Sequence, residues 1–158
     1  MNRNEEHFMQ EALKEAIIAF EKDDVPVGAV IEYKGKIIAR AHNQVELLKD
    51  PTAHAEMIAV TQATHFLKSK WLQDCSLYVT IEPCSMCAGA LVLSRIKNLY
   101  YGADDPKTGA CGSVINVAHH KKLNHRIKVK KGILEQESSL LLKEFFKRKR
   151  RLESVVNN

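Results

Sequence analysis

The sequence predicts an α/β domain in which a mixed β-sheet is covered by helices. Segments with apolar residues at helical spacing alternate with short β-rich segments along most of the chain. Such alternation is typical of a sheet that contains parallel strands and packs against helices. The length of 158 residues fits one domain, and 45% apolar residues are enough to build its core.

The first half of the chain is expected to form a helix, a β-hairpin and a second helix. Apolar residues recur at helical spacing over residues 5–21, and Pro26 follows that helix. The β-rich runs Gly28–Tyr33 and Lys36–Ala41 surround a Lys-Gly pair, which is a hairpin signal. After a polar stretch, the run from Ala53 to Leu67 favours a helix with Thr52 as its N-cap.

The second half is expected to add three strands and two helices. The strands are predicted at Ser76–Ile81, Lys97–Tyr101 and Ile127–Ile133. Pro83 opens a short helix that runs to Leu93, because proline suits the first helical turn. Gly102–Gly112 forms a long loop, and Glu135–Arg151 forms the last helix. Residues 152–158 are expected to be a frayed tail.

Positive charge is concentrated in the second half. Residues 1–80 contain 9 Lys+Arg and 12 Asp+Glu, and residues 81–158 contain 15 and 7, so the net charges are −3 and +8. A basic half favours an anionic partner, with nucleic acid as the first candidate. The run Lys147–Arg151 has a second interpretation, since cations at a helix end also interact favourably with the helix dipole. Further cations between Lys121 and Lys131 favour a binding surface.

The composition also indicates a compartment. No apolar run approaches the ~20 residues that span a bilayer, and the first residues are acidic where a signal peptide is apolar. We therefore expect a cytoplasmic protein with no membrane partner. There, the four cysteines are expected to be thiols or metal ligands, because disulfides are rare in that compartment.

Three side chains from two predicted helix starts form a candidate zinc site. Cys84 and Cys87 are three residues apart, so on one helical turn their sulfur atoms lie on the same face. His54, at the start of the other helix, adds an imidazole nitrogen. One imidazole and two thiolates suit zinc, and three protein ligands leave the fourth tetrahedral position for water, as in catalytic zinc sites.

Glu56 is the candidate catalytic acid/base. Residues two apart on a regular helix point about 200° apart, which would separate Glu56 from His54. In a first turn, however, side chains lean toward the N-terminus and can converge beyond the helix end. A carboxylate there could take a proton from zinc-bound water and deliver it to a substrate.

Other interpretations of these residue types remain open. A lone CxxC also occurs in redox pairs and in four-ligand structural zinc sites, and a lone HxE occurs by chance. Cys75 or Cys111 could fill the fourth position of such a zinc site. Cys75 precedes an apolar strand and Cys111 lies in a glycine-rich loop, so both are interpreted as ordinary packed or loop thiols. His119 and His120 follow an apolar stretch and are interpreted as structural or RNA-facing.

The two motifs together resemble a known signature. His54-Ala55-Glu56 with Pro83-Cys84-Ser85-Met86-Cys87 is similar to the signature of the zinc-dependent cytidine/deoxycytidylate deaminase superfamily. Further segments resemble its bacterial tRNA-specific adenosine deaminase (TadA-type) branch, among them VPVGAV at 25–30, residues 50–59, residues 101–113 and LLLKEFFKR at 140–148. The resemblance covers residues 5–151 and implies a single deaminase domain over 1–158. It also implies a three-layer α/β/α cytidine-deaminase-like fold with a central five-stranded mixed sheet.

The resemblance implies a reaction and its partners. The wobble adenosine of a tRNA anticodon, position 34, would be deaminated to inosine with release of ammonia. His54, Cys84 and Cys87 would hold one Zn²⁺ per subunit, and zinc-bound hydroxide would attack C6 of adenine while Glu56 moves the protons. The expected partners are a tRNA anticodon stem-loop and, because the family is homodimeric, a second subunit.

The resemblance also implies contacts in the base pocket. Asn43 would contact the base, and the backbone N–H of Ala55 would lie beside the reacting centre; without the resemblance, Asn43 is a turn residue. Asp105 and Lys107 could bond ribose or phosphate from their loop, or form a solvated turn.

The last helix supplies the remaining candidates. Phe145 and Phe146 lie on different faces of that helix, so one can be buried while the other stacks on a base. Phe146 is expected to face RNA, with Arg148 contacting phosphates.

Two other functions remain open on the sequence. A superfamily member that deaminates guanine, cytosine or a nucleoside would share the zinc chemistry but would not need the basic half. A non-catalytic RNA-binding zinc module would not need Glu56.

Overall fold

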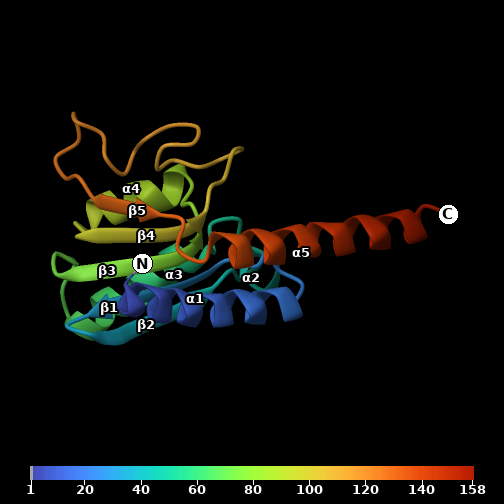
Figure 1. The fold of residues 1–158 in the computed structure, drawn as a ribbon, viewed down its shortest axis with the longest axis horizontal. Helices are drawn as coiled ribbons and strands as arrows, with labels where there is room; N and C mark the ends of the chain where they lie inside the picture. The colour runs from blue at the N-terminus through green and yellow to red at the C-terminus, as the bar shows by residue number, and fades with distance from the viewer. Residues whose placement is uncertain (1) are drawn as a thin grey trace.

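A computed structural model describes residues 2–158 (Figure 1). Its elements in chain order are α1 (Arg3–Glu21), β1 (Gly28–Tyr33), β2 (Lys36–His42), α2 (Val45–Leu48), α3 (Ala55–Leu67), β3 (Cys75–Ile81), α4 (Ser85–Leu93), β4 (Asn98–Ala103), β5 (Lys128–Lys131) and α5 (Glu135–Val156). No helix among the described residues combines the length and apolar character that a membrane crossing requires.

The five strands form one mixed sheet in the order β2-β1-β3-β4-β5. Strand β1 is antiparallel to β2 and β3, whereas β3, β4 and β5 are mutually parallel. The β1–β2 hairpin turns at Lys34 and Gly35, whose φ angles of 50° and 82° are those of the turns that match the twist of a hairpin. The predicted hairpin and mixed sheet are therefore confirmed.

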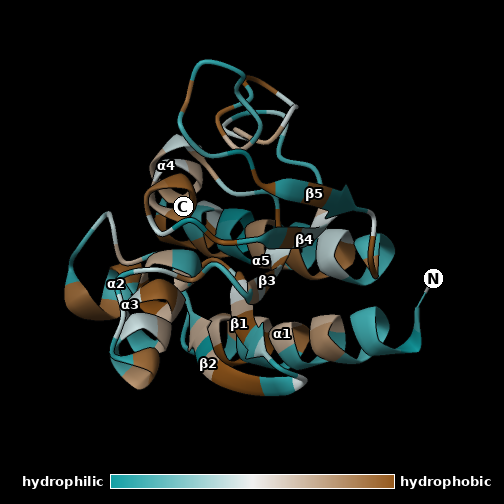
Figure 2. Cartoon of the chain, turned by 90° about the vertical axis from the view of Figure 1, so that its left-hand side faces the viewer, coloured by the Kyte–Doolittle hydropathy of each residue, from teal (hydrophilic) through white to brown (hydrophobic). Residues whose placement is uncertain are grey.

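The helices cover both faces of the sheet, which makes three layers. Side chains alternate between the two faces of a strand, so Ile31, Leu77 and Leu99 enter the core beneath α3 and α4. Val30 and Tyr78 point the other way, into a second cluster with α1. Figure 2 shows α1 and α5 on one side of the sheet and α3 and α4 on the other. The predicted three-layer α/β/α fold is confirmed.

Gly28 allows α1 to approach the sheet closely. A Cβ atom at this position would lie 2.0 Å from the carbonyl oxygen of Ala12 and 2.4 Å from the backbone nitrogen of Ala16. Both alanines are fully buried, so small residues meet where helix and strand touch. This contact holds the middle of α1 directly against the start of β1.

The segments that carry the candidate site all lie at one end of the strands. Because β1 runs opposite to its two neighbours while β3 and β4 are parallel, the ends of β2, β3 and β4 lie together with the start of β1. Asn43 follows β2, Glu82 follows β3 and Asp104 follows β4. The polar segments that begin at these three residues therefore start at the same end of the sheet.

The structure corrects the predicted helix starts. The N-cap of α3 is His54, and Thr52 lies in the preceding turn, where its backbone N–H and hydroxyl both donate to the Asp50 carboxylate. Helix α4 begins at Ser85 with Cys84 as N-cap, two residues later than expected from Pro83. The four-residue helix α2 was not predicted, because one turn is too short to show a period.

The structure also corrects the predicted end of the chain. Helix α5 extends to Val156, so most of the expected tail over residues 152–158 is helical. The reason is that no glycine or proline interrupts the chain after Glu135, and good helix formers such as Lys, Arg, Leu and Glu predominate there. Figure 1 shows this helix projecting away from the rest of the domain.

Candidate metal centre and substrate pocket

His54, Cys84 and Cys87 form a group that could hold a metal ion. Their ligand atoms all lie within 4.8 Å of one another. The Nδ1 atom of His54 is 3.6 Å from Cys84 Sγ and 3.5 Å from Cys87 Sγ. His54 and Cys84 are the N-caps of α3 and α4, so the positive ends of two helix dipoles meet at the group.

The distances suit a tetrahedral zinc site. At usual zinc–nitrogen and zinc–sulfur bond lengths, a tetrahedral ion holds these two ligand types about 3.6 Å apart. A hydrogen bond between the two sulfur atoms lowers the pKa of Cys84 to about 4, which favours the Cys84 thiolate, and raises the pKa of Cys87. A thiolate is the form that binds metals.

Glu56 lies beside this group in a nearly dry environment. Its side chain is only 4% exposed in the first turn of α3. Burial raises the pKa of its carboxyl group, and Oε1 has no hydrogen-bond partner among the described residues. A buried carboxylate oxygen without a partner is costly unless a ligand uses it. Glu56 is therefore available to exchange a proton with a bound molecule.

A pocket of about 600 Å³ opens above these residues. The lining comes from the turn after α1, the segment that includes Asn43 and Glu46, the end of β3, the starts of α3 and α4, the loop with Asp105 and Thr108, and α5. Its volume lies within the usual range for small-molecule sites. The pocket can hold one base with its sugar beside the metal group.

Asn43 and Ala55 are brought together at the pocket wall. The backbone N–H of Ala55 donates to Asn43 Oδ1 over 2.8 Å, so this N–H is already used within the chain. Asn43 is 7% exposed and lines the pocket. Because its amide oxygen is occupied, Asn43 can offer its amide N–H₂ group to a ligand.

Asp105 lies at the pocket, whereas Lys107 does not. Asp105 lines the pocket together with Thr108. Its carboxylate accepts hydrogen bonds from the backbone N–H groups of Lys107 and Thr108 and from the Thr108 hydroxyl. The Lys107 side chain is exposed and stands outside the pocket lining.

Helix α5 provides one rim of the pocket. Phe145 is 2% exposed, and its ring packs against Phe20 at a centroid distance of 6.1 Å. Phe146 is 43% exposed and also lines the pocket. Arg148 donates to the carbonyl oxygen of Phe20 over 2.9 Å, and its guanidinium lies 4.2 Å from the Phe20 ring centroid.

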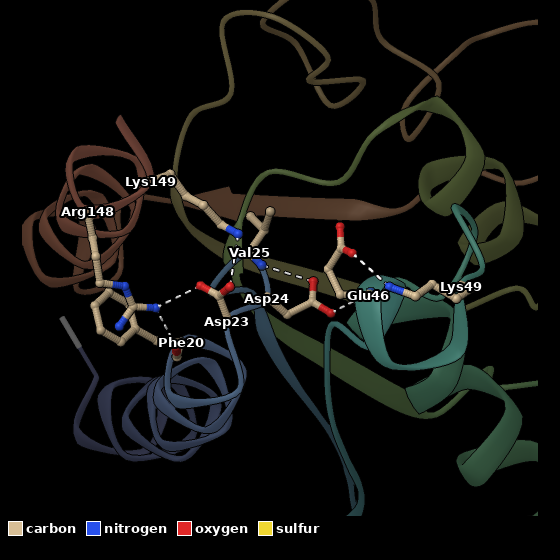
Figure 3. Close-up of polar contacts among 8 residues, drawn as sticks. All are labelled: Phe20, Asp23, Asp24, Val25, Glu46, Lys49, Arg148 and Lys149. Carbon is tan, nitrogen blue, oxygen red and sulfur yellow. Dashed lines mark hydrogen bonds and ion pairs between the residues drawn. The ribbon is translucent and has the colours of Figure 1, made fainter. Parts of the chain in front are cut away.

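Two aspartates in the turn after α1 bind the neighbouring parts of the pocket wall (Figure 3). Asp23 receives Arg148 and Lys149 from α5, at 3.2 and 3.0 Å. Asp24 is 3% exposed and accepts the backbone N–H groups of Val25 and Glu46, each over 2.9 Å. Asp24 therefore joins the turn after α1 to the start of α2.

The other candidate ligands lie outside the metal group. Cys75 is fully buried at the start of β3, and burial raises its pKa to about 11. Cys111 is 8% exposed, with its Sγ 3.9 Å from the Pro83 carbonyl oxygen. His119 contacts the carbonyl oxygen of Ile127, and His120 accepts the backbone N–H of Lys122.

Sequence reasoning missed the structural carboxylates of the pocket. Asp24 and Glu82 are both 3% exposed and both line the pocket. Glu82 stands directly after the apolar strand SLYVTI and before Pro83-Cys84, and a charge in that place is the one available signal. Nothing in the sequence indicates which backbone groups these carboxylates bind.

Comparison with known proteins gives consistent matches over nearly the whole chain. The model of the MafB19-like deaminase family matches residues 3–150. A tRNA-specific adenosine deaminase of Aquifex aeolicus (strain VF5) is 54% identical over 145 residues, which are 92% of this chain and 95% of the relative.

Solved structures agree with these matches. One, from a study of A-to-I editing by tRNA:A34 deaminases at the wobble position, is 45% identical with a TM-score of 0.83 and covers 86% of this chain and 99% of its own. A guanine deaminase from Nitrosomonas europaea is 25% identical with a TM-score of 0.77, over 89% and 83% of the two chains. The fold, the sequence identity and the coverage together show that the chain belongs to the tRNA-specific adenosine deaminase family.

Proposed function

We propose that this protein deaminates the wobble adenosine of a tRNA anticodon, position 34, to inosine and releases ammonia. The observation that carries the proposal is Glu56, a buried carboxylate with an unpartnered oxygen, beside the His54, Cys84 and Cys87 group at the base of a pocket. The identity of 54% to a tRNA-specific adenosine deaminase supports the choice of substrate.

His54, Cys84 and Cys87 would hold one zinc ion per subunit, through the imidazole nitrogen and the two sulfur atoms. The nitrogen–sulfur distances of 3.5 and 3.6 Å support this choice. When bound, zinc lowers the pKa of a water molecule to near neutrality and so supplies a nucleophile at physiological pH.

Glu56 moves the protons of the reaction. Its carboxylate accepts one proton from the attacking water and delivers it to N1 of adenine as the C6–O bond forms. The second proton of that water passes through the same carboxylate to the amino group, which leaves as ammonia when the C6–N bond breaks. The raised pKa of Glu56 suits a group that must both accept and return a proton.

Asn43 orients the base within the pocket. Its amide oxygen is fixed by the Ala55 N–H, so its N–H₂ group is directed by the protein before the substrate arrives. The adenosine must leave its stack to reach Glu56, and the pocket volume of about 600 Å³ can accept a flipped nucleotide.

The remaining candidates bind the flanking RNA. Phe146 is exposed at the pocket rim, where an aromatic ring can stack on a neighbouring base. Asp105 contributes the loop wall, and Lys107 and Arg148 contact ribose or phosphate groups. The net charge of +8 over residues 81–158 supports an RNA partner.

We also propose that the protein is a homodimer and acts in the cytoplasm, where its tRNA substrate is found. Leu47 and Leu48 support a partner subunit near the pocket, since they are 67% and 55% exposed on α2 while Glu46 of the same helix lines the pocket. Light scattering coupled to gel filtration tests the dimer. A mass close to 17.9 kDa would contradict it.

Inosine formation in an anticodon stem-loop with adenosine at the wobble position tests the proposed function. The same stem-loop with guanosine there and adenosine elsewhere in the loop is the matched control, and free adenosine, guanine and cytosine are assayed in parallel. We expect inosine only at the wobble position. Turnover of free guanine with inactive RNA would contradict the proposal and favour the activity named for the Nitrosomonas relative.

A further inference from the structure

Glu82 occupies an unusual position between the metal group and the pocket wall. It is 3% exposed, and no cation pairs with it among the described residues. Its neighbours in the chain are the buried end of β3 and the segment Pro83-Cys84, whose cysteine belongs to the metal group. The mechanism proposed above gives this carboxylate no role.

Four hydrogen-bond donors surround the Glu82 carboxylate. Oε1 accepts the backbone N–H of Asp105 over 3.1 Å and the hydroxyl of Ser113. Oε2 accepts the backbone N–H groups of Cys111 and Ser113 over 3.0 and 3.1 Å. Both oxygens of this side chain therefore accept two hydrogen bonds each from the loop.

The loop over residues 105–113 is therefore wrapped around this one side chain. Gly109 shows how closely it packs, since a Cβ atom there would lie 2.4 Å from Glu82 Oε2 and 2.5 Å from the Asp105 carbonyl oxygen. The loop is also tied to the metal turn directly, because the backbone N–H of Ala110 donates to the Pro83 carbonyl oxygen over 2.9 Å.

We propose that Glu82 is a positioning residue that fixes loop 105–113 against the metal-ligand turn and so sets the width of the substrate pocket. The loop carries Asp105 and Thr108, which line the pocket, and Glu82 is two residues from Cys84. One buried anion thus couples the wall that contacts the substrate to the turn that holds the metal. The expected effect of Glu82 on RNA binding rests on the proposed function, whereas its expected effect on the order of the loop does not.

Glu82→Gln is the decisive variant, because the amide has the same size but turns one acceptor into a donor. With the amide nitrogen at the Oε2 position, the bonds from the Cys111 and Ser113 N–H groups are lost; at the Oε1 position, the bond from the Asp105 N–H is lost, because the Ser113 hydroxyl can turn to accept. In either orientation the loop loses a backbone hydrogen bond to this side chain. Glu32→Gln is the matched control: Glu32 also accepts a backbone N–H, that of Gly35, but at the hairpin away from the pocket. Ser113→Ala, which removes a single bond to Glu82, is a milder second variant.

Hydrogen exchange tests the positioning role without any assay of activity. In Glu82→Gln, peptides that cover residues 105–113 are expected to exchange at least about tenfold faster, while peptides from β1 and β3 keep the wild-type rate. Zinc content is expected to stay at the wild-type level, since all three ligands remain. Faster exchange in every peptide, or unchanged exchange in the loop, would overturn the proposal.

Kinetics with the wobble stem-loop test the consequence for the substrate. We expect KM to rise about tenfold or more with a smaller change in kcat, a weaker effect in Ser113→Ala, and none in Glu32→Gln. Unchanged KM together with faster loop exchange would show that the loop does not set the pocket, which also overturns the proposal. If the wild type itself fails to produce inosine, the proposed function is wrong, and the exchange experiment still decides the role of Glu82.

Discussion

Arg148 on the last helix lies against Asp23 in the turn after the first helix, with Nη2 3.2 Å from Oδ1 although the two residues are 125 apart in the chain. Lys149 binds the other oxygen of the same carboxylate over 3.0 Å, and its hydrogen bond lowers the pKa of Asp23. One carboxylate thus offsets part of the positive charge of these two cations within the protein. A phosphate that binds these cations competes with Asp23 for them.

Asp23→Asn is therefore expected to improve RNA binding. These ion pairs are exposed, so each contributes at most about 1 kcal/mol, and their loss leaves α5 held by the buried Phe145. We expect KM for the wobble stem-loop to fall about two- to fivefold at low salt, with the advantage disappearing as salt is raised.

Glu21→Gln controls for the change in net charge, because it removes one exposed carboxylate that forms no ion pair with α5 among the described residues. A comparable fall in KM in this variant would show a general charge effect. A rise in KM in Asp23→Asn would show instead that the aspartate holds the two cations in their working position.

Substitution of Phe145 is expected to lower stability, whereas substitution of Phe146 is expected to weaken RNA binding. Phe145→Ala opens a cavity at a fully packed position and is expected to cost about 3 kcal/mol, which lowers Tm by on the order of 10 °C. Phe146→Ala removes an exposed ring, so Tm is expected to stay close to that of the wild type while KM for the stem-loop rises. Thermal melting and steady-state kinetics of both variants check this. Equal losses of Tm would contradict the assignment of the two faces.

Removal of the metal is expected to expose one reactive thiolate. The pKa of Cys84 is lowered to about 4 by its hydrogen bond with Cys87, and Cys84 is half-buried, whereas burial raises the pKa of Cys75 to about 11. After chelation, Cys84 is expected to react first with iodoacetamide, at a rate that changes little between about pH 5 and 8 because the thiolate already predominates. Peptide mass spectrometry measures this.

Zinc provides the control for the thiol experiment. Readdition of zinc is expected to protect Cys84 and to leave the slow labelling of Cys75 unchanged. A Cys84 rate that rises tenfold per pH unit, as for an ordinary thiol, would contradict the thiol arrangement described here.

The layers of the fold could be predicted from local patterns. The Lys-Gly pair at 34–35 marks the hairpin because glycine adopts the positive φ that such a turn requires, and the structure places both residues at positive φ. The spacing of His54, Cys84 and Cys87 likewise predicts a shared group, which the structure brings within 4.8 Å. The first residue of a helix is less predictable. Threonine is a common N-cap residue, but the hydroxyl of Thr52 donates to the Asp50 carboxylate and the N-cap is His54.

The contacts that shape the pocket could not be predicted, because they depend on tertiary structure. Glu82 binds backbone groups 23 to 31 residues away, and Asp24 reaches Glu46 across 22 residues. A carboxylate that binds backbone N–H groups leaves no pattern in a sequence, because any residue type supplies the donor. The same holds for Arg148, whose type indicates a phosphate contact but whose nearest acceptors are Phe20 and Asp23.

The role that we propose for Glu56 is to carry the protons of a deamination at the metal group. The most direct test measures inosine at the wobble adenosine of an anticodon stem-loop for the wild type and for Glu56→Gln, with zinc content determined on the same samples. We expect both proteins to bind the same amount of zinc and the variant to lose about 10²- to 10⁴-fold in kcat. Full activity in Glu56→Gln with zinc retained would contradict the account.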